Sequence, residues 1–231
     1  TLAYFGSLVE NVRTFSTNDP KYASVLVSKG SFEENQGNFA EAERVLLQAR
    51  KIFIESNHTS DPVYGTLLHT LMSIYHELGN EEKETEEELN YQNFIVKENG
   101  YVSIEFVSYV QMRSLHLLEQ KDYANAEKAL LEAHRIIKKI DSLKINAPAS
   151  LIDLEANGYS SLAMVYIYMF QDLNNQITKT GTADQKSKWL MAKEDVLDRA
   201  EEYLEKSLAL RRGSSQRMDM EMQMIILKIF Q

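Results

Sequence analysis

Apolar residues recur every three or four positions along much of the 231-residue chain. A clear example is the stripe of Ala42, Leu46, Ala49 and Phe53, which would lie on one face of a helix. Only 3 prolines and 9 glycines interrupt the chain. This composition favours long helices over short strands that are joined by tight turns. The pattern therefore predicts an all-α fold.

One helical segment occurs twice. QGNFAEAERVLLQA begins at Gln36, and QKDYANAEKALLEA begins at Gln120, which is 84 residues later. Halfway between them, LGNEEKETEEELNY begins at Leu78 and keeps the turn residues Gly79 and Asn80, although the helix that follows has become acidic. The chain therefore repeats with a period of 42 residues, which predicts an array of similar units.

Each unit is expected to contain two antiparallel helices. The dipeptides Asp19-Pro20 and Asp61-Pro62 recur at the same period and mark helix starts, because Asp caps free amides and Pro is tolerated in the first turn. Gly37 would end a first helix, since glycine readily takes the left-handed conformation. Pairs of this kind stack into an α-α superhelix, in which each pair packs its apolar side on its neighbour.

A recurrent set of aromatic, glycine, alanine and leucine positions accompanies these helices. The first unit has Leu26, Gly30, Gly37, Phe39, Ala42, Leu46 and Ala49; the second has Leu68, Leu71, Tyr75 and Gly79; the third has Val110, Leu117, Tyr123, Ala126, Leu130 and Ala133. This set resembles the tetratricopeptide repeat. Two departures are Glu33, where tyrosine is usual, and Glu84, where alanine is expected in the second helix of the second unit.

The 42-residue spacing resembles the longer repeat of the kinesin-light-chain type, which is also common in bacterial multidomain proteins. The resemblance implies one solenoid over residues 1–231, and we expect it to be an excerpt of a larger protein. Its expected parts are the second helix of a preceding repeat (1–17), repeats at 18–59, 60–101 and 102–145, a fourth repeat (146–212) with an inserted loop (174–187), and a C-terminal helix (213–231) that starts a further repeat or forms a cap.

Residues 218–230 are apolar on two sides of the last expected helix, so this helix needs partners on two sides. We therefore expect either that more repeats or another domain follow, or that the segment mediates self-association with a second copy.

Charge and composition exclude several classes of function. The net charge of −9 and the lack of a basic stripe argue against nucleic-acid binding. No run approaches the roughly 20 apolar residues of a membrane span, so we expect no membrane contact. The chain has 0 cysteines, which excludes disulfides, thiolate metal sites and a cysteine nucleophile. We expect a cytoplasmic location.

Candidate chemistry is sparse. His69 and His76 share one face of a helix, but two turns separate them by about 10 Å, too far to bind one zinc ion without a third element. The acidic run at 81–88 is typical of a solvated helix start, which the helix dipole favours. No nucleophile motif or phosphate loop is present. We therefore expect no metal site, no cofactor and no enzymatic activity.

In tetratricopeptide proteins the first helices of successive units line a concave face, and the resemblance implies that this face binds a partner. It would carry Leu115 and Met164 together with the candidate binding residues Asn35, His69, Ser73, His76, Glu77, Gln111, Glu119, Asn157, Ser160 and Tyr168. The basic residues with which the best-known peptide-binding members grip a terminal carboxylate are absent. A peptide ligand should therefore be neutral or basic and partly apolar.

The sequence favours a non-catalytic protein–protein interaction scaffold that binds a peptide or a partner domain. The alternative is a regulatory module that senses a ligand or peptide and controls an effector or DNA-binding domain outside this sequence. Fold resemblance does not decide between them.

Overall fold

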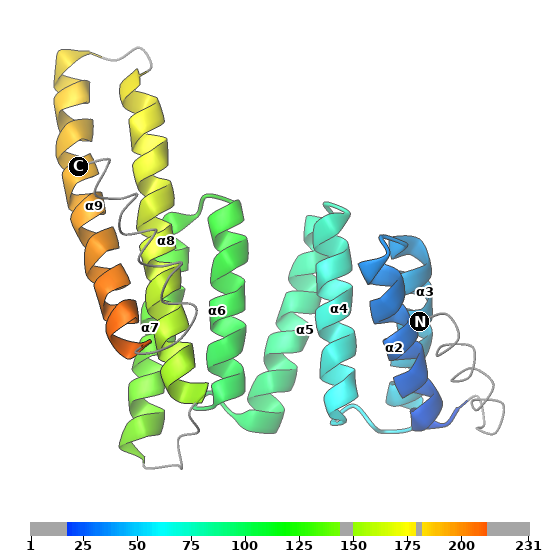
Figure 1. The fold of residues 1–231 in the computed structure, drawn as a ribbon. Helices are drawn as coiled ribbons and strands as arrows, with labels where there is room; N and C mark the ends of the chain where they lie inside the picture. Colours follow the sequence, from blue (N-terminus) through cyan, green and yellow to red (C-terminus); the bar gives the residue numbers. More distant parts are fainter. Residues whose placement is uncertain (1–17, 144–149, 179–181, 212–231) are drawn as a thin grey trace. The chain divides into compact units, whose positions relative to one another are not determined.

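The computed structural model describes residues 18–143, 150–178 and 182–211 (Figure 1), so the helices expected at 1–17 and 213–231 lie outside the described residues. Every regular element in the described ranges is an α-helix, which confirms the all-α prediction. The helices are α2 (Pro20–Asn35), α3 (Phe39–Glu55), α4 (Pro62–Glu77), α5 (Glu81–Asn99), α6 (Ile104–Glu119), α7 (Tyr123–Ser142), α8 (Ser150–Thr178) and α9 (Ala183–Leu210).

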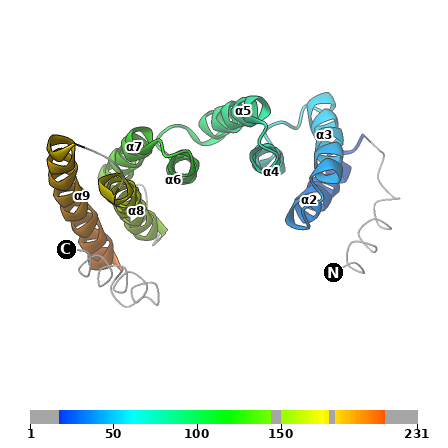
Figure 2. The same ribbon diagram turned by 90° about the horizontal axis from the view of Figure 1, so that it is seen from above.

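The chain forms two compact units, a first unit over residues 1–100 and a second unit over residues 101–231. The first unit contains the helical hairpins α2–α3 and α4–α5, and the second contains α6–α7 and α8–α9 (Figure 2). Successive hairpins within each unit also pack on each other, α4 on α2 and α3, and α8 on α6 and α7. This is the neighbour-on-neighbour packing of a helical repeat.

The predicted helix starts are present. The Asp19 carboxylate accepts a hydrogen bond from the amide of Lys21 at 2.8 Å, and Asp61 accepts one from the amide of Val63 at the same distance. A proline follows each aspartate in the first turn of its helix. Local chemistry therefore fixes where the first helix of each hairpin in the first unit begins.

The turns between paired helices share one conformation. Gly37, Gly79 and Lys121 have φ angles of 76°, 64° and 60°. At each turn the amide of this residue donates to the carbonyl oxygen three residues earlier, and the next amide donates to the one five residues earlier. A left-handed backbone costs a residue with a Cβ atom about 1–2 kcal/mol, so Lys121 is an exception at a position suited to glycine.

Small residues let the paired helices approach closely. A Cβ atom on Gly30 of α2 would lie 2.5 Å from Cγ of Leu46 on α3, a leucine that is fully buried. In the second unit Leu130 of α7 is also fully buried, in a cluster with Leu118 of α6 and Leu162 of α8. Leu46 and Leu130 occupy equivalent repeat positions, and each anchors the second helix of its hairpin.

The acidic helix α5 departs from the expectation of a wholly solvated face. Glu87 is buried, and both of its carboxylate oxygens accept hydrogen bonds from the Arg50 guanidinium of α3, at 2.8 and 2.5 Å. Only Glu87 and Ile95 of this helix are buried. The acidic run therefore combines exposed carboxylates with one that ties α5 to the preceding hairpin.

The inserted loop predicted at 174–187 is wrong for most of its length. α8 continues to Thr178 and α9 begins at Ala183. The segment contains many polar residues, but polar side chains are stable on a helix that packs against a single neighbouring helix. Here Lys193 of α9 donates to Asn174 of α8 at 3.4 Å and lies over the Phe170 ring. At the start of α9, Thr182 and Gln185 form a reciprocal capping box.

None of the helices in the described part of the chain combines the length and the apolar run needed to cross a bilayer.

Candidate functional site

A groove of about 520 Å³ lies in the second unit, where α6, the start of α7 and α8 meet. We call it the α6–α8 groove. It is lined by Leu115, Leu118, Glu119, Lys121, Tyr123, Met164, Tyr168, Gln171 and Asp172. Its volume falls in the range of ligand-binding clefts in proteins.

Large apolar side chains are exposed in this groove. Leu115 on α6 is 50% exposed and Tyr168 on α8 is 39% exposed. Met164 lies one turn before Tyr168 on α8, and Leu118 is buried. Because methionine is flexible and polarizable, it adapts to ligands of different shape. The groove therefore offers apolar contacts from two helices.

One end of the groove is polar. The Asp172 carboxylate accepts hydrogen bonds from Lys121 Nζ at 2.9 and 3.1 Å and from the Tyr123 hydroxyl at 2.8 Å. Burial, together with the neighbouring Asp172 carboxylate, raises the pKa of Tyr123 to about 12. Tyr123 is therefore a protonated hydrogen-bond donor at neutral pH.

The structure brings part of the predicted binding face together and gives another part structural contacts. Glu119 and Tyr168 line the α6–α8 groove, with Leu115 and Met164. The remaining candidates of the second unit instead connect helices. Gln111 Nε2 donates to a backbone carbonyl oxygen of α8 at 2.7 Å, Ser160 lies 2.9 Å from the Ser207 hydroxyl, and Asn157 accepts a hydrogen bond from Arg211.

The candidates of the first unit lie on α2 and α4. The Asn35 amide donates to a carbonyl oxygen of its own helix at 2.6 Å, and the His69 ring packs edge-on against Tyr91 with 5.5 Å between ring centroids. Ser73 is half-buried and Glu77 is exposed. None of these four residues lines the α6–α8 groove, which belongs to the other unit.

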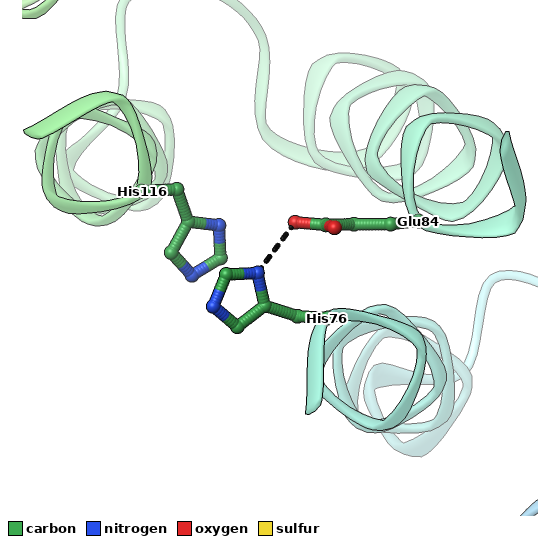
Figure 3. Close-up of side chains that lie close together, drawn as sticks. All are labelled: His76, Glu84 and His116. Atoms are coloured by element: carbon green, nitrogen blue, oxygen red, sulfur yellow. Dashed lines mark hydrogen bonds and ion pairs between the residues drawn. The ribbon is translucent and has the colours of Figure 1, made fainter. Parts of the chain in front are cut away.

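His76 is engaged with the acidic helix. Its Nδ1 atom lies 2.9 Å from Oε1 of Glu84, as Figure 3 shows, so the contact joins α4 to α5. Glu84 replaces the alanine expected at this repeat position, and its carboxylate is largely buried. The substitution therefore exchanges close apolar packing for a polar contact within the hairpin.

Sequence reasoning missed a contact that recurs between repeats. The Tyr75 hydroxyl donates to Glu43 at 2.8 Å, and the Lys83 ammonium donates to the same carboxylate oxygen at 2.8 Å. In the second unit the Tyr166 hydroxyl donates to Glu127. Arg199 completes that group, because its Nη1 atom donates to the Tyr166 hydroxyl at 3.1 Å. We call each group of three residues a tyrosine–glutamate clamp.

The position of these clamps was visible in the sequence. Glu43 and Glu127 are identical residues 84 positions apart, each directly after an alanine of the apolar stripe. Burial and the carboxylate partner raise the pKa of Tyr75 and Tyr166, so both hydroxyls remain donors at neutral pH. Each clamp connects the second helix of one hairpin with both helices of the next.

His134 is a buried histidine, and one of its ring nitrogens has no hydrogen-bond partner among the described residues. Its side chain on α7 is 6% exposed, and Nδ1 lies 3.1 Å from the Leu130 carbonyl oxygen. Because a carbonyl only accepts, Nδ1 carries the hydrogen of the neutral ring. Nε2 is buried and has no hydrogen-bond partner among the described residues. Gly158 of α8 abuts the ring, and a Cβ atom there would lie 2.7 Å from His134 Cε1.

We expect the protein to lose stability as the pH falls below about 6.5, the ordinary histidine pKa. Burial lowers the pKa of His134, although the hydrogen bond to the Leu130 carbonyl and the charge of Glu155 act in the opposite direction; Lys138 and Lys206 add to the effect of burial. The folded state therefore resists protonation, and the stability present above pH 6.5 is lost as the pH falls through the lower folded pKa. Urea unfolding at several pH values should show that the free energy of unfolding depends less on pH in His134→Gln than in the unaltered protein. An unchanged pH dependence would contradict the role of His134.

Comparisons with known proteins address the fold. No protein-family model and no curated protein sequence matches the chain. The described structure has the helical repeat fold of tetratricopeptide type. It is similar to the crystal structure of BtubC (BKLC) from P. vanneervenii, a kinesin-light-chain-like protein, with a TM-score of 0.61 and 15% sequence identity over 92% of this chain and 73% of that chain. The fold class predicted from the sequence is thus confirmed.

Proposed function

We propose that this chain is a non-catalytic interaction module that binds a peptide segment of a partner protein in the α6–α8 groove. The observation that carries the proposal is the exposure of Leu115 on α6 and Tyr168 on α8, which line one groove. Exposed apolar side chains gathered in a cleft are typical of binding sites, because a ligand removes them from water.

The charges of the groove indicate the kind of peptide. Glu119 and Asp172 contribute two carboxylates, whereas Lys121 is its one cation among the lining residues. The whole chain has a net charge of −9. Electrostatic complementarity therefore favours a neutral or basic peptide with an apolar side chain that packs between Leu115 and Tyr168.

The groove is better suited to binding than to acid–base chemistry. The Tyr123 hydroxyl in the groove has a pKa raised to about 12 by burial and by Asp172, far from the neutral range that suits proton transfer. The helical repeat fold also supports a scaffold role in general terms. Both observations support the non-catalytic part of the proposal.

Fluorescence anisotropy with labelled peptides about ten residues long tests this proposal. Each peptide carries one central leucine, flanked by lysine, serine or glutamate, and we expect affinity to decrease in that order. Leu115→Asp and Tyr168→Asp should each weaken binding of the serine peptide, which has no flanking charge for the new carboxylate to attract, by about tenfold, or about 1.4 kcal/mol. The exchanged side chains are already partly exposed, so thermal unfolding should change little.

Leu143→Asp is the matched control. Leu143 is 55% exposed and follows the end of α7, outside the groove lining, so the substitution adds the same charge elsewhere in the second unit. It should leave peptide binding unchanged. Equal weakening by Leu143→Asp and Leu115→Asp would contradict a groove site, as would a set of peptides that does not bind at all.

A further inference from the structure

Lys121 occupies a turn position that the two preceding repeats give to glycine. Its φ angle of 60° matches those of Gly37 (76°) and Gly79 (64°), and its backbone hydrogen bonds follow the same pattern. Glycine takes this conformation without strain, whereas a residue with a Cβ atom is strained there. Backbone strain of this kind points to a role for the side chain when the side chain reaches a functional site.

The Lys121 side chain does reach the α6–α8 groove. Its ammonium lies 2.9 and 3.1 Å from the two carboxylate oxygens of Asp172, and both residues line the groove. The Lys121 side chain is 65% exposed and that of Asp172 is 30% exposed. Ion pairs that are open to solvent contribute little to stability, so another cation can replace this ammonium with little loss.

Asp172 would keep its position without the lysine. The Tyr123 hydroxyl donates to it at 2.8 Å, and this tyrosine remains a donor because burial and the carboxylate raise its pKa to about 12. A carboxylate has about four acceptor positions, so Asp172 can keep the tyrosine while it accepts from a ligand. The partners of this carboxylate thus include a permanent donor, Tyr123, and an exchangeable donor, Lys121.

We propose that Asp172 determines the specificity of the groove by binding an arginine or lysine side chain of the peptide, and that Lys121 is the internal cation which that side chain replaces. The proposal rests on the proposed function, because it names the charged residue that the groove's peptide must carry. Lys121 neutralises the carboxylate in the free protein and competes with the peptide for it.

The geometry of α8 also sets the spacing of the peptide residues. Tyr168 and Asp172 are four residues apart on α8, so they lie on one face, about one 5.4 Å helical turn from each other. An extended peptide advances about 3.3 Å per residue, so its residues i and i+2 span a similar distance. The groove should therefore recognise an apolar residue and a basic residue separated by one position.

The experiment compares two labelled peptides that differ in one group. One has leucine and arginine separated by a single serine, and the other has citrulline in place of arginine, which keeps the shape and removes the charge. The intact chain should bind the arginine peptide about tenfold more tightly, equivalent to about 1.4 kcal/mol. Asp172→Asn should reduce this preference to about twofold or less, while binding of the citrulline peptide changes little.

Lys121→Gly separates competition from structural support. Restoring glycine relieves the left-handed backbone, so the free energy of unfolding should stay the same or rise. Affinity for the arginine peptide should increase severalfold, with little change for the citrulline peptide. Lys128→Ala is the control, because it removes an exposed cation from α7 outside the groove lining, where solvent screens its charge, and it should change the affinity for either peptide little.

The results distinguish this inference from the function on which it rests. Equal binding of the arginine and citrulline peptides to the intact chain would overturn the role of Asp172 and leave peptide binding intact. A Lys121→Gly variant that unfolds more easily and binds the arginine peptide no better would show that the ion pair is only structural. If neither peptide binds, nor any of the lysine, serine and glutamate set, both proposals fail.

Discussion

Arg50→Met is expected to lower the free energy of unfolding by about 3 kcal/mol. The substitution removes both guanidinium donors from the Glu87 carboxylate, whose side chain is only 4% exposed. A buried carboxylate that loses its cation must either stay charged in a poorly solvated site or take up a proton, and both are unfavourable. This loss is near the lower end of the range of about 3–5 kcal/mol for removing one partner of a buried ion pair. The reason is that the Arg50 side chain itself is 20% exposed.

Urea unfolding of single and double variants measures this effect. Arg50→Met combined with Glu87→Leu should recover most of the lost stability, because two apolar side chains can replace a buried ion pair. Arg44→Met is the matched control on the same helix: Arg44 pairs with Glu41 in solvent, with its side chain 61% exposed, and should change stability by less than about 1 kcal/mol. Equal losses for Arg50→Met and Arg44→Met would contradict the importance of burial.

Leu46→Ala should destabilise the first unit by a similar amount, about 3 kcal/mol, because it leaves a cavity against Gly30 at the contact between α2 and α3. Glycine at that position offers no side chain to fill the space. Leu47→Ala removes the same atoms from the next position on α3, where the side chain is 41% exposed, and should cost less than about 1 kcal/mol.

The comparison of the two leucines tests the packing of the helical hairpin itself. Thermal or urea unfolding of both variants, followed by far-ultraviolet circular dichroism, gives the difference directly. If Leu47→Ala proved as harmful as Leu46→Ala, the assignment of the buried face of α3 would be wrong.

The sequence predicted those features of the fold that depend on local chemistry. The Asp19 and Asp61 caps, the left-handed Gly37 turn and the buried face around Leu46 each follow from residue types and their spacing. The error at 174–187 has a local cause as well. Asn174 and its polar neighbours resemble a loop, whereas pairing with α9 keeps them helical.

The candidate site was only partly predictable. Tyr168 and Glu119 could be placed on the predicted binding face from their positions on the first helices of successive repeats. The contact of Asp172 with Lys121 joins residues 51 positions apart, and no repeat pattern indicates it. Burial of Glu87 was hidden for a similar reason, because its partner Arg50 lies 37 residues earlier. Such pairs join residues of different hairpins. Their contacts depend on how the hairpins pack, and the sequence pattern of a single repeat carries no information about that packing.

The most direct test of peptide binding in the α6–α8 groove is nuclear magnetic resonance of methyl-labelled methionines during titration with the leucine–arginine peptide. Met164 lines the groove, whereas Met72 is 1% exposed in the first unit. We predict that the Met164 methyl resonance shifts in proportion to bound peptide and that the Met72 resonance stays in place. A peptide that binds and shifts Met72 but not Met164, or that shifts neither, would contradict the groove as the binding site.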